Sequence, residues 1–141
     1  AACKITLPTD VRVAHLLTEN APSRVLSVDA IPADQMALDI GPKTAHAMNQ
    51  VIAACRTVIW NGPLGAFEVT PFDTGTNTVA RTVADRTKIG ALNSIAGGGD
   101  TMAALVHAKS AAGFTYVSLA GGAFLEWLEG RKLPGIEALR T

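Results

Sequence analysis

The stretch Ser94–Thr101, SIAGGGDT, joins a short apolar run to three consecutive glycines and then to Asp100 and Thr101. Apolar residues recur at helical spacing from Met102 to Val106, which predicts a helix that begins at Asp100. Glycines let a ligand approach the backbone, and a helix N-terminus carries unpaired N–H groups and about half a positive charge. The stretch therefore predicts either an anion site or, more simply, a tight turn that Asp100 caps.

Asp100 has a specific meaning if the turn binds phosphate. A carboxylate repels phosphate, so it contributes to such a site by holding a divalent cation. The neighbouring Thr101 hydroxyl is then expected to assist the phosphate or to cap the helix. On this interpretation Asp100 is the candidate metal ligand.

Strands and helices alternate along most of the chain, which predicts βαβ units, a mainly parallel sheet and a Rossmann-like three-layer sandwich. We expect residues 36–43 to be a loop, because Pro42 delays the next helix until Thr44. Three successive strands, ending at Trp60, Ile95 and Leu119, each enter a glycine-bearing turn, and these turns should lie along one carboxyl edge. The expected strands are 4–7, 11–17, 24–28, 57–60, 91–95 and 115–119, and the expected helices are 44–55, 73–87, one from 100, and 123–128.

Composition excludes several classes of function. The 12 basic and 12 acidic residues cancel and no basic run adjoins aromatic residues, which argues against nucleic-acid binding. The histidines and the two cysteines, Cys3 and Cys55, lack metal-ligand spacing. No apolar run reaches about 18 residues, so we expect a soluble, cytoplasmic protein. A dinucleotide-dependent dehydrogenase is disfavoured because no G-x-G-x-x-G motif ends a strand.

Five motifs carry a family resemblance. They occur in order along the whole chain: KITLPTDV at 4–11, LDIGPKT at 38–44, WNGPLGAFE at 60–68, AGGGDT at 96–101 and GGAFLEWLEGRKLPGIEAL at 121–139. Together they resemble phosphoglycerate kinase, specifically the later part of its C-terminal nucleotide-binding domain. The resemblance implies that 1–141 is a partial nucleotide-binding domain of a two-domain kinase, with its sheet incomplete on the N-terminal side.

The resemblance also implies an activity and its site. Phosphoglycerate kinases transfer a phosphoryl group reversibly between ATP-Mg and 3-phosphoglycerate, and backbone N–H donors and a cation suit that chemistry. The implied catalytic glycines are Gly98, Gly121 and Gly122. Nucleotide-binding roles fall on Gly98, Gly99, Asp100 and Thr101 at the phosphates, Asn61 and Pro63 beside the adenosine, Glu68 at the ribose and Gly41 at the base, with Asp100 also holding Mg²⁺.

The chain departs from the family pattern in its last glycine turn, where it has Ser118-Leu-Ala-Gly-Gly-Ala-Phe124 in place of STGGGAS. Ala120 is harmless there only if its φ is negative, whereas Leu119 and Phe124 put contacts of the closed enzyme in question. Ala37 also stands where the family has glycine.

The resemblance implies that an acceptor domain and the first βα units lie outside this chain. We therefore expect a fragment that is inactive alone, or in the alternative a non-catalytic nucleotide-binding module. A mean hydropathy of +0.26 fits an exposed apolar sheet edge and predicts self-association of the fragment, whereas the full-length protein is expected to be a monomer.

Overall fold

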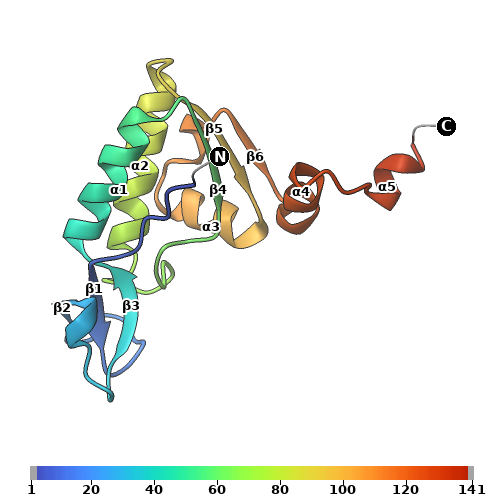
Figure 1. The fold of residues 1–141 in the computed structure, drawn as a ribbon. Coiled ribbons are helices and arrows are strands. Elements are labelled where there is room, and N and C mark those ends of the chain that lie inside the picture. Colours follow the sequence, from blue (N-terminus) through green and yellow to red (C-terminus); the bar gives the residue numbers. More distant parts are fainter. Residues whose placement is uncertain (1–2, 140–141) are drawn as a thin grey trace.

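The structure is a computed structural model that describes residues 3–139, and it contains two small sheets joined by helices (Figure 1). The described helix and strand elements, in chain order, are β1 (Asp10–Ala14), β2 (Arg24–Ser27), β3 (Met36–Ile40), α1 (Pro42–Ala54), β4 (Thr57–Asn61), α2 (Thr74–Lys88), β5 (Asn93–Gly97), α3 (Gly99–His107), β6 (Tyr116–Ser118), α4 (Gly121–Leu128) and α5 (Pro134–Glu137), with 3₁₀ turns at Val28–Ala30 and Ala111–Gly113.

The second half of the chain forms the predicted parallel sheet, in the order β4-β5-β6. Trp60 pairs with Ala96, and Ala96 pairs in turn with Val117. Helices α2 and α3 connect consecutive strands, as parallel pairing requires. The carboxyl ends of the three strands therefore lie at one edge of this sheet, which confirms the prediction.

Helices α1, α2 and α3 share one hydrophobic core with the sheet. Alternate strand residues face this core: Trp60 is 8% exposed and Ala96 fully buried, and they lie in one cluster with Val79, Val83 and Leu105. On the opposite face of β4, Ile59 is 47% exposed. Within residues 3–139 the core therefore has a helical layer on one sheet face, and the three-layer sandwich is not complete.

The first half of the chain corrects the expectation of a mainly parallel sheet. Strands β1, β2 and β3 form a separate antiparallel sheet in the order β2-β1-β3. The connections between these strands are short and hold no α-helix, and antiparallel neighbours need none. Residues 36–40, expected to be a loop, pair with β1 as strand β3.

Pro42 starts helix α1 instead of delaying it. Gly41 is the N-cap and Pro42 the first helical residue, a position where proline costs nothing because its missing N–H has no helical partner. The buried Asp10 carboxylate accepts hydrogen bonds from the N–H groups of Thr44, at 2.7 Å, and Lys43, at 3.1 Å. Burial opposes ionisation of Asp10, but these bonds and the Thr44 hydroxyl hold its pKa below the usual value.

Residues 4–7 are not a strand. Ile5 is 79% exposed and Leu7 73% exposed, and no described strand pairs with this segment. An extended apolar segment becomes a strand only where a partner supplies ladder hydrogen bonds, so its β-branched pattern alone misled the prediction.

The last two helices extend from the body as an arm (Figure 1). Neither α4 nor α5 contains a buried residue, and Trp127 is 55% exposed. The predicted C-cap Gly130 is instead the residue after the C-cap Glu129, and its φ of 81° is the left-handed conformation with which a glycine commonly ends a helix. Among the described helices, not one combines the length and apolar character needed to span a membrane.

Candidate functional site

The turns that follow β4, β5 and β6 meet at one point. A Cβ added to Gly121 would lie 2.7 Å from the Gly98 Cα and 3.3 Å from the Asn61 Oδ1, so the three residues are in direct contact. The Gly98 N–H also donates to the Ser118 carbonyl at 2.9 Å. One residue from each predicted turn is thus brought to the same edge of the sheet.

Gly98 has a backbone conformation that only glycine adopts readily. Its φ of 108° lies in the left-handed region, and it serves as the N-cap of α3. Having no side chain, it cannot cap the first-turn N–H groups of α3, which lack partners within the helix. Gly99 and Asp100, in that turn, are exposed.

The N-terminus of α4 adds a second group of such donors. Its N-cap is Ala120, which makes no side-chain capping bond. The Gly121 N–H donates to the Leu119 carbonyl at 3.2 Å, and the next donor is that of the exposed Gly122. Ala120 has φ of −88°, so alanine is accommodated there without strain. Because Gly98 and Gly121 touch, the two helix N-termini present their N–H groups side by side, which suits an anion with several oxygens.

Asp100 is the acidic residue of the first turn of α3. No cluster of three or more potential side-chain ligands for a metal occurs among the described residues. Mg²⁺ commonly binds to one or two carboxylates, with phosphate oxygens and water completing its shell. A single exposed carboxylate beside free helix N–H groups fits that mode of binding, with the phosphates supplying the remaining ligands.

Thr101 is buried, and its hydroxyl group forms a hydrogen bond within the fold. It is 2% exposed, and its Oγ1 accepts a hydrogen bond of 2.7 Å from the Gly62 N–H. This bond fastens the turn after β4 to the start of α3. The role of Thr101 at the phosphates stays a prediction, and the structure adds a role in positioning.

Thr101→Val should lower the free energy of unfolding by about 1–3 kcal/mol, because it leaves the Gly62 N–H without its acceptor. Thr101→Ser keeps the hydroxyl and is the matched control. Chemical denaturation of both variants measures the difference. Equal stability of the valine variant and the parent chain would contradict the role of this bond.

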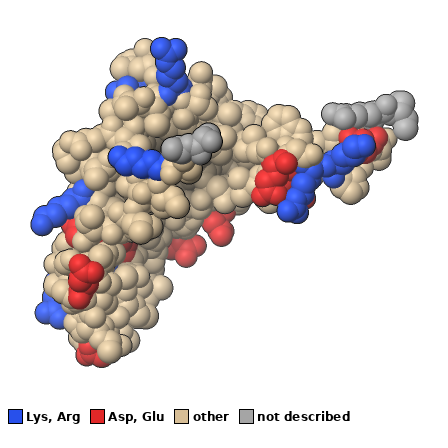
Figure 2. All heavy atoms as spheres, in the orientation of Figure 1, with Lys and Arg blue, Asp and Glu red and all other residues tan. Residues whose placement is uncertain are grey.

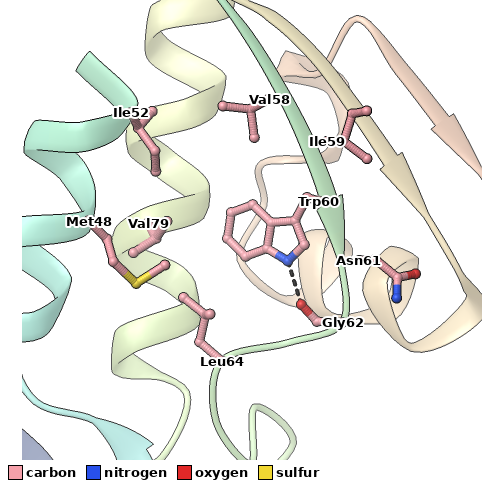
Figure 3. Close-up of a pocket in the computed structure, with 9 residues that line it drawn as sticks. All are labelled: Met48, Ile52, Val58, Ile59, Trp60, Asn61, Gly62, Leu64 and Val79. Carbon is pink, nitrogen blue, oxygen red and sulfur yellow. Dashed lines mark hydrogen bonds between the residues drawn. The ribbon is translucent and has the colours of Figure 1, made fainter. Parts of the chain in front are cut away.

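The segment 61–68 is held from several sides. The Trp60 indole nitrogen donates to the Gly62 carbonyl at 2.5 Å, and the indole ring lies toward α2 while Asn61 lies on the other side of β4 (Figure 3). Gly62 has φ of 88°. Further along, the Leu64 N–H donates to the Thr76 hydroxyl at 3.1 Å. At the end of the segment, Phe67 is buried and Glu68 is exposed. The role of Glu68 at the ribose stays a prediction.

Pro63 borders an open hollow of about 420 Å³ between this segment and β3. The opposite wall contains Ala37 and Leu38, which the sequence prediction missed because it interpreted 36–40 as a loop. The hollow is lined largely by apolar and backbone atoms, the kind of surface that receives a flat apolar ring. Its lining residues are Pro8, Val11, Ala37, Leu38, Asp39, Ile40, Pro63, Leu64, Gly65 and Ala66.

A second hollow, of about 250 Å³, lies under Trp60 between β4 and helices α1 and α2 (Figure 3). Met48, Ile52 and Val79 line it, and Trp60 is itself a core residue. Its side-chain lining is apolar apart from Asn61 at its rim, so it lacks the polar groups that orient a ligand.

Gly41 lies apart from the glycine turns. It is buried against Asp10, whose carboxylate fills the space that a Cβ would occupy, and it lines a different hollow beside Arg12 and His46. Its predicted contact with a base is untested. What the structure does show is that this position needs glycine for the packing of Asp10.

Charged side chains do not form a large patch of one sign on the face shown in Figure 2. The three turns, 61–66, 97–101 and 118–122, contain no lysine or arginine. Positive charge within these turns is therefore limited to the partial charges of helix N-termini and backbone N–H groups.

A parallel α/β sheet with glycine turns and free helix N-termini along its carboxyl edge defines a class of phosphate-binding proteins. Residues 1–131 match the family model described as Phosphoglycerate kinase. The chain belongs to this family.

Individual members of the family match the chain over almost its whole length. The chain is 58% identical over 140 residues to the phosphoglycerate kinase of Xanthobacter autotrophicus, which covers 99% of this chain and 35% of the relative. It is 56% identical to that of Sphingopyxis alaskensis, over all of this chain and 35% of the relative. The structure of phosphoglycerate kinase from Coxiella burnetii matches with a TM-score of 0.84 and 44% identity, over 94% of this chain and 33% of that one. The chain thus spans about a third of the length of these relatives.

Proposed function

We propose that this chain is the nucleotide-binding part of a phosphoglycerate kinase, the glycolytic enzyme that converts 1,3-bisphosphoglycerate and ADP reversibly into 3-phosphoglycerate and ATP. The observation that carries the proposal is the contact between Gly98 and Gly121, which joins two free helix N-termini at one sheet edge. In the family's two-domain arrangement, residues 1–141 would form part of the C-terminal domain.

Gly98 and Gly121 shape the two turns in this proposal, because their own N–H groups donate to the Ser118 and Leu119 carbonyls. The N–H groups of Gly99 and Asp100 hold the ADP phosphates, while that of Gly122 faces the phosphoryl group in transfer. Such donors stabilise charge on the equatorial oxygens without a nucleophile or a general base. Asp100 holds Mg²⁺, which neutralises charge on the phosphates when bound. Thr101 contributes by fixing the turn that leads to Asn61.

The adenosine half of the nucleotide is assigned to the hollow beside Pro63. From the phosphates at Gly98, the ligand passes Asn61, which touches that glycine turn, and its base enters the space between Pro63 and Leu38. Glu68 is exposed and free to accept hydrogen bonds from the ribose hydroxyls. Gly41 retains only the family resemblance as support for a base contact.

Phosphoryl transfer is expected to fail in this chain alone. The acceptor, 3-phosphoglycerate, carries a carboxylate and a phosphate, and its binding calls for full cationic charges that the three turns do not contain. The chain by itself would then act as a nucleotide-binding module without turnover. Its relatives are about three times as long, and the remainder would supply the acceptor groups.

Calorimetric titration of the chain with ADP and with NAD, each with and without Mg²⁺, tests the proposal. Saturable ADP binding that Mg²⁺ strengthens, with no response to NAD, is the expected result. Equal binding of NAD, or no binding of ADP, would contradict it. A coupled assay with ATP and 3-phosphoglycerate should detect no turnover, and turnover by the isolated chain would refute the expectation of inactivity.

A further inference from the structure

Asp39 is a buried carboxylate that the proposed nucleotide contacts do not use. It is 4% exposed, and its Oδ2 accepts a hydrogen bond of 2.7 Å from the Gly75 N–H while its Oδ1 accepts one of 2.8 Å from the Ile40 N–H. Gly75 is the second residue of α2, where the N–H has no partner within the helix. Asp39 therefore caps α2 from strand β3.

The residue that precedes α2 does not supply this cap. Asp73 makes no side-chain capping bond, and its carboxylate instead pairs with Asn77 at 2.8 Å and with His107 at 3.0 Å. The N-terminus of α2 thus depends on a carboxylate from another element, and α2 is held to β3 at that point.

The same carboxylate fills a slot beside the segment that follows β4. A Cβ on Gly65 or on Gly75 would overlap the Asp39 Oδ1. Gly65 lacks the left-handed φ that Gly62 has, so it is glycine because the Asp39 carboxylate and the Phe72 carbonyl oxygen leave no space for a Cβ. Asp39 is consequently in close contact with both α2 and the segment 62–66.

Two hydrogen bonds fix that segment on either side of the slot. The Ala66 N–H donates to the Leu38 carbonyl of β3 at 2.8 Å, and the Leu64 N–H donates to the Thr76 hydroxyl of α2 at 3.1 Å. Asp39 lies between these two attachments. Pro63 on this segment and Ala37 and Leu38 on β3 line the 420 Å³ hollow, which Asp39 lines as well.

We propose that Asp39 is a positioning residue for nucleotide binding: its carboxylate, held between Gly65 and Gly75, spaces Pro63 from β3 and so shapes the hollow that receives the base. This inference rests on the proposed function. Asp39 touches no phosphate or sugar in the proposal and acts through Gly65 and Gly75.

The ionisation of Asp39 offers an independent readout. Burial raises the pKa of Asp39 to about 6, against the hydrogen bonds from Gly75 and Ile40 and the charge of Arg12 on β1, while Asp73 beside α2 raises it further. The segment 62–66 contributes no ionisable group. Since the folded-state pKa exceeds the unfolded one, the part of the stability that depends on protonation of Asp39 is complete below about pH 4 and is lost as the pH rises through about 6.

Asp39→Asn is the test variant, because asparagine keeps the shape but provides only one oxygen for two N–H donors. We expect ADP affinity at pH 7.5 to fall about tenfold, hydrogen exchange to accelerate in 62–66, and the stability change between pH 4 and 6 to flatten. Asp85→Asn, an exposed carboxylate on the same α2, is the control and should match the parent chain.

Gly65→Ala supplies a second, independent measurement. In the parent chain it should weaken ADP binding, because the added Cβ meets the Asp39 Oδ1 and, at 2.6 Å, the Phe72 carbonyl oxygen. In an Asp39→Ala background only the contact with Phe72 remains, so the same substitution should cost less there. This coupling remains measurable even if Asp39→Asn proves poorly folded.

The outcomes separate the two proposals. If the parent chain binds ADP while Asp39→Asn binds it equally well, with unchanged exchange in 62–66, the positioning role is overturned. If the parent chain does not bind ADP, the proposed function is contradicted. The role of Asp39 in holding the segment is then decided by hydrogen exchange in 62–66 of Asp39→Asn and by comparing the unfolding stability of Gly65→Ala with and without Asp39→Ala.

Discussion

Gly121→Ala is expected to weaken ADP binding at least about tenfold, because the new methyl group would stand 2.7 Å from the Gly98 Cα and 3.0 Å from the Gly98 nitrogen. Backbone atoms cannot move aside as the end of a side chain can. The turn after β6 must therefore separate from the glycine turn after β5, and the two helix N-termini no longer face one ligand. Calorimetry with ADP and Mg²⁺ measures the loss.

Gly135→Ala is the matched control for this glycine substitution. Gly135 lies in α5, no atom stands within 4 Å of its added Cβ, and it has no part in the proposed site. It should bind ADP as the parent chain does. Unchanged affinity in Gly121→Ala as well would show that the contact between the turns is not needed for binding.

Asp100→Asn should abolish the strengthening of ADP binding by Mg²⁺. The amide has no charge with which to hold the cation, so affinities with and without Mg²⁺ should become about equal. Without Mg²⁺, the variant should bind ADP at least as well as the parent chain, because a negative charge near the phosphates has been removed. This opposite sign in the two conditions distinguishes a metal ligand from a residue that only supports the fold.

The exposed Asp85 provides the control for that measurement, since Asp85→Asn removes the same charge from the side of α2. Its response to Mg²⁺ should equal that of the parent chain. If Asp100→Asn also keeps the full response, the assignment of Asp100 as the metal ligand is wrong.

The three glycine turns of the candidate site were predictable from the sequence because they depend on local chemistry. Glycines after three apolar strands, with helical spacing behind Gly98 and Gly121, fix the strands, the turns and the helix starts. Parallel connection through helices then brings the carboxyl ends to one edge. Only the meeting of Asn61, Gly98 and Gly121 at van der Waals distance needed the structure.

The rest of the candidate site depends on contacts between distant segments, which no local pattern reveals. Residues 36–40 are short and run into Gly41 and Pro42, so they were interpreted as a loop, yet pairing with β1 makes them a strand. With β3 missing from the prediction, the wall formed by Ala37 and Leu38 was missing too. Asp39 likewise accepts a hydrogen bond from the N–H group of Gly75, which lies 36 positions further along the chain.

The glycines of this chain serve two different structural purposes. Gly98 and Gly121 are exposed at least in part and frame the candidate site, whereas Gly41 and Gly75 are buried and leave room for the carboxylates of Asp10 and Asp39. Sequence inspection cannot separate a glycine that faces a ligand from one that faces a neighbouring side chain.

The central claim is that ADP phosphates bind where the turns after β5 and β6 meet. Backbone amide NMR of the isotope-labelled chain, titrated with ADP and Mg²⁺, tests it most directly. The account predicts that the largest shifts occur at the N–H groups of Gly99, Asp100 and Gly122. Unmoved signals from these three residues, with shifts confined to the hollow under Trp60 or to the start of α1, would contradict it.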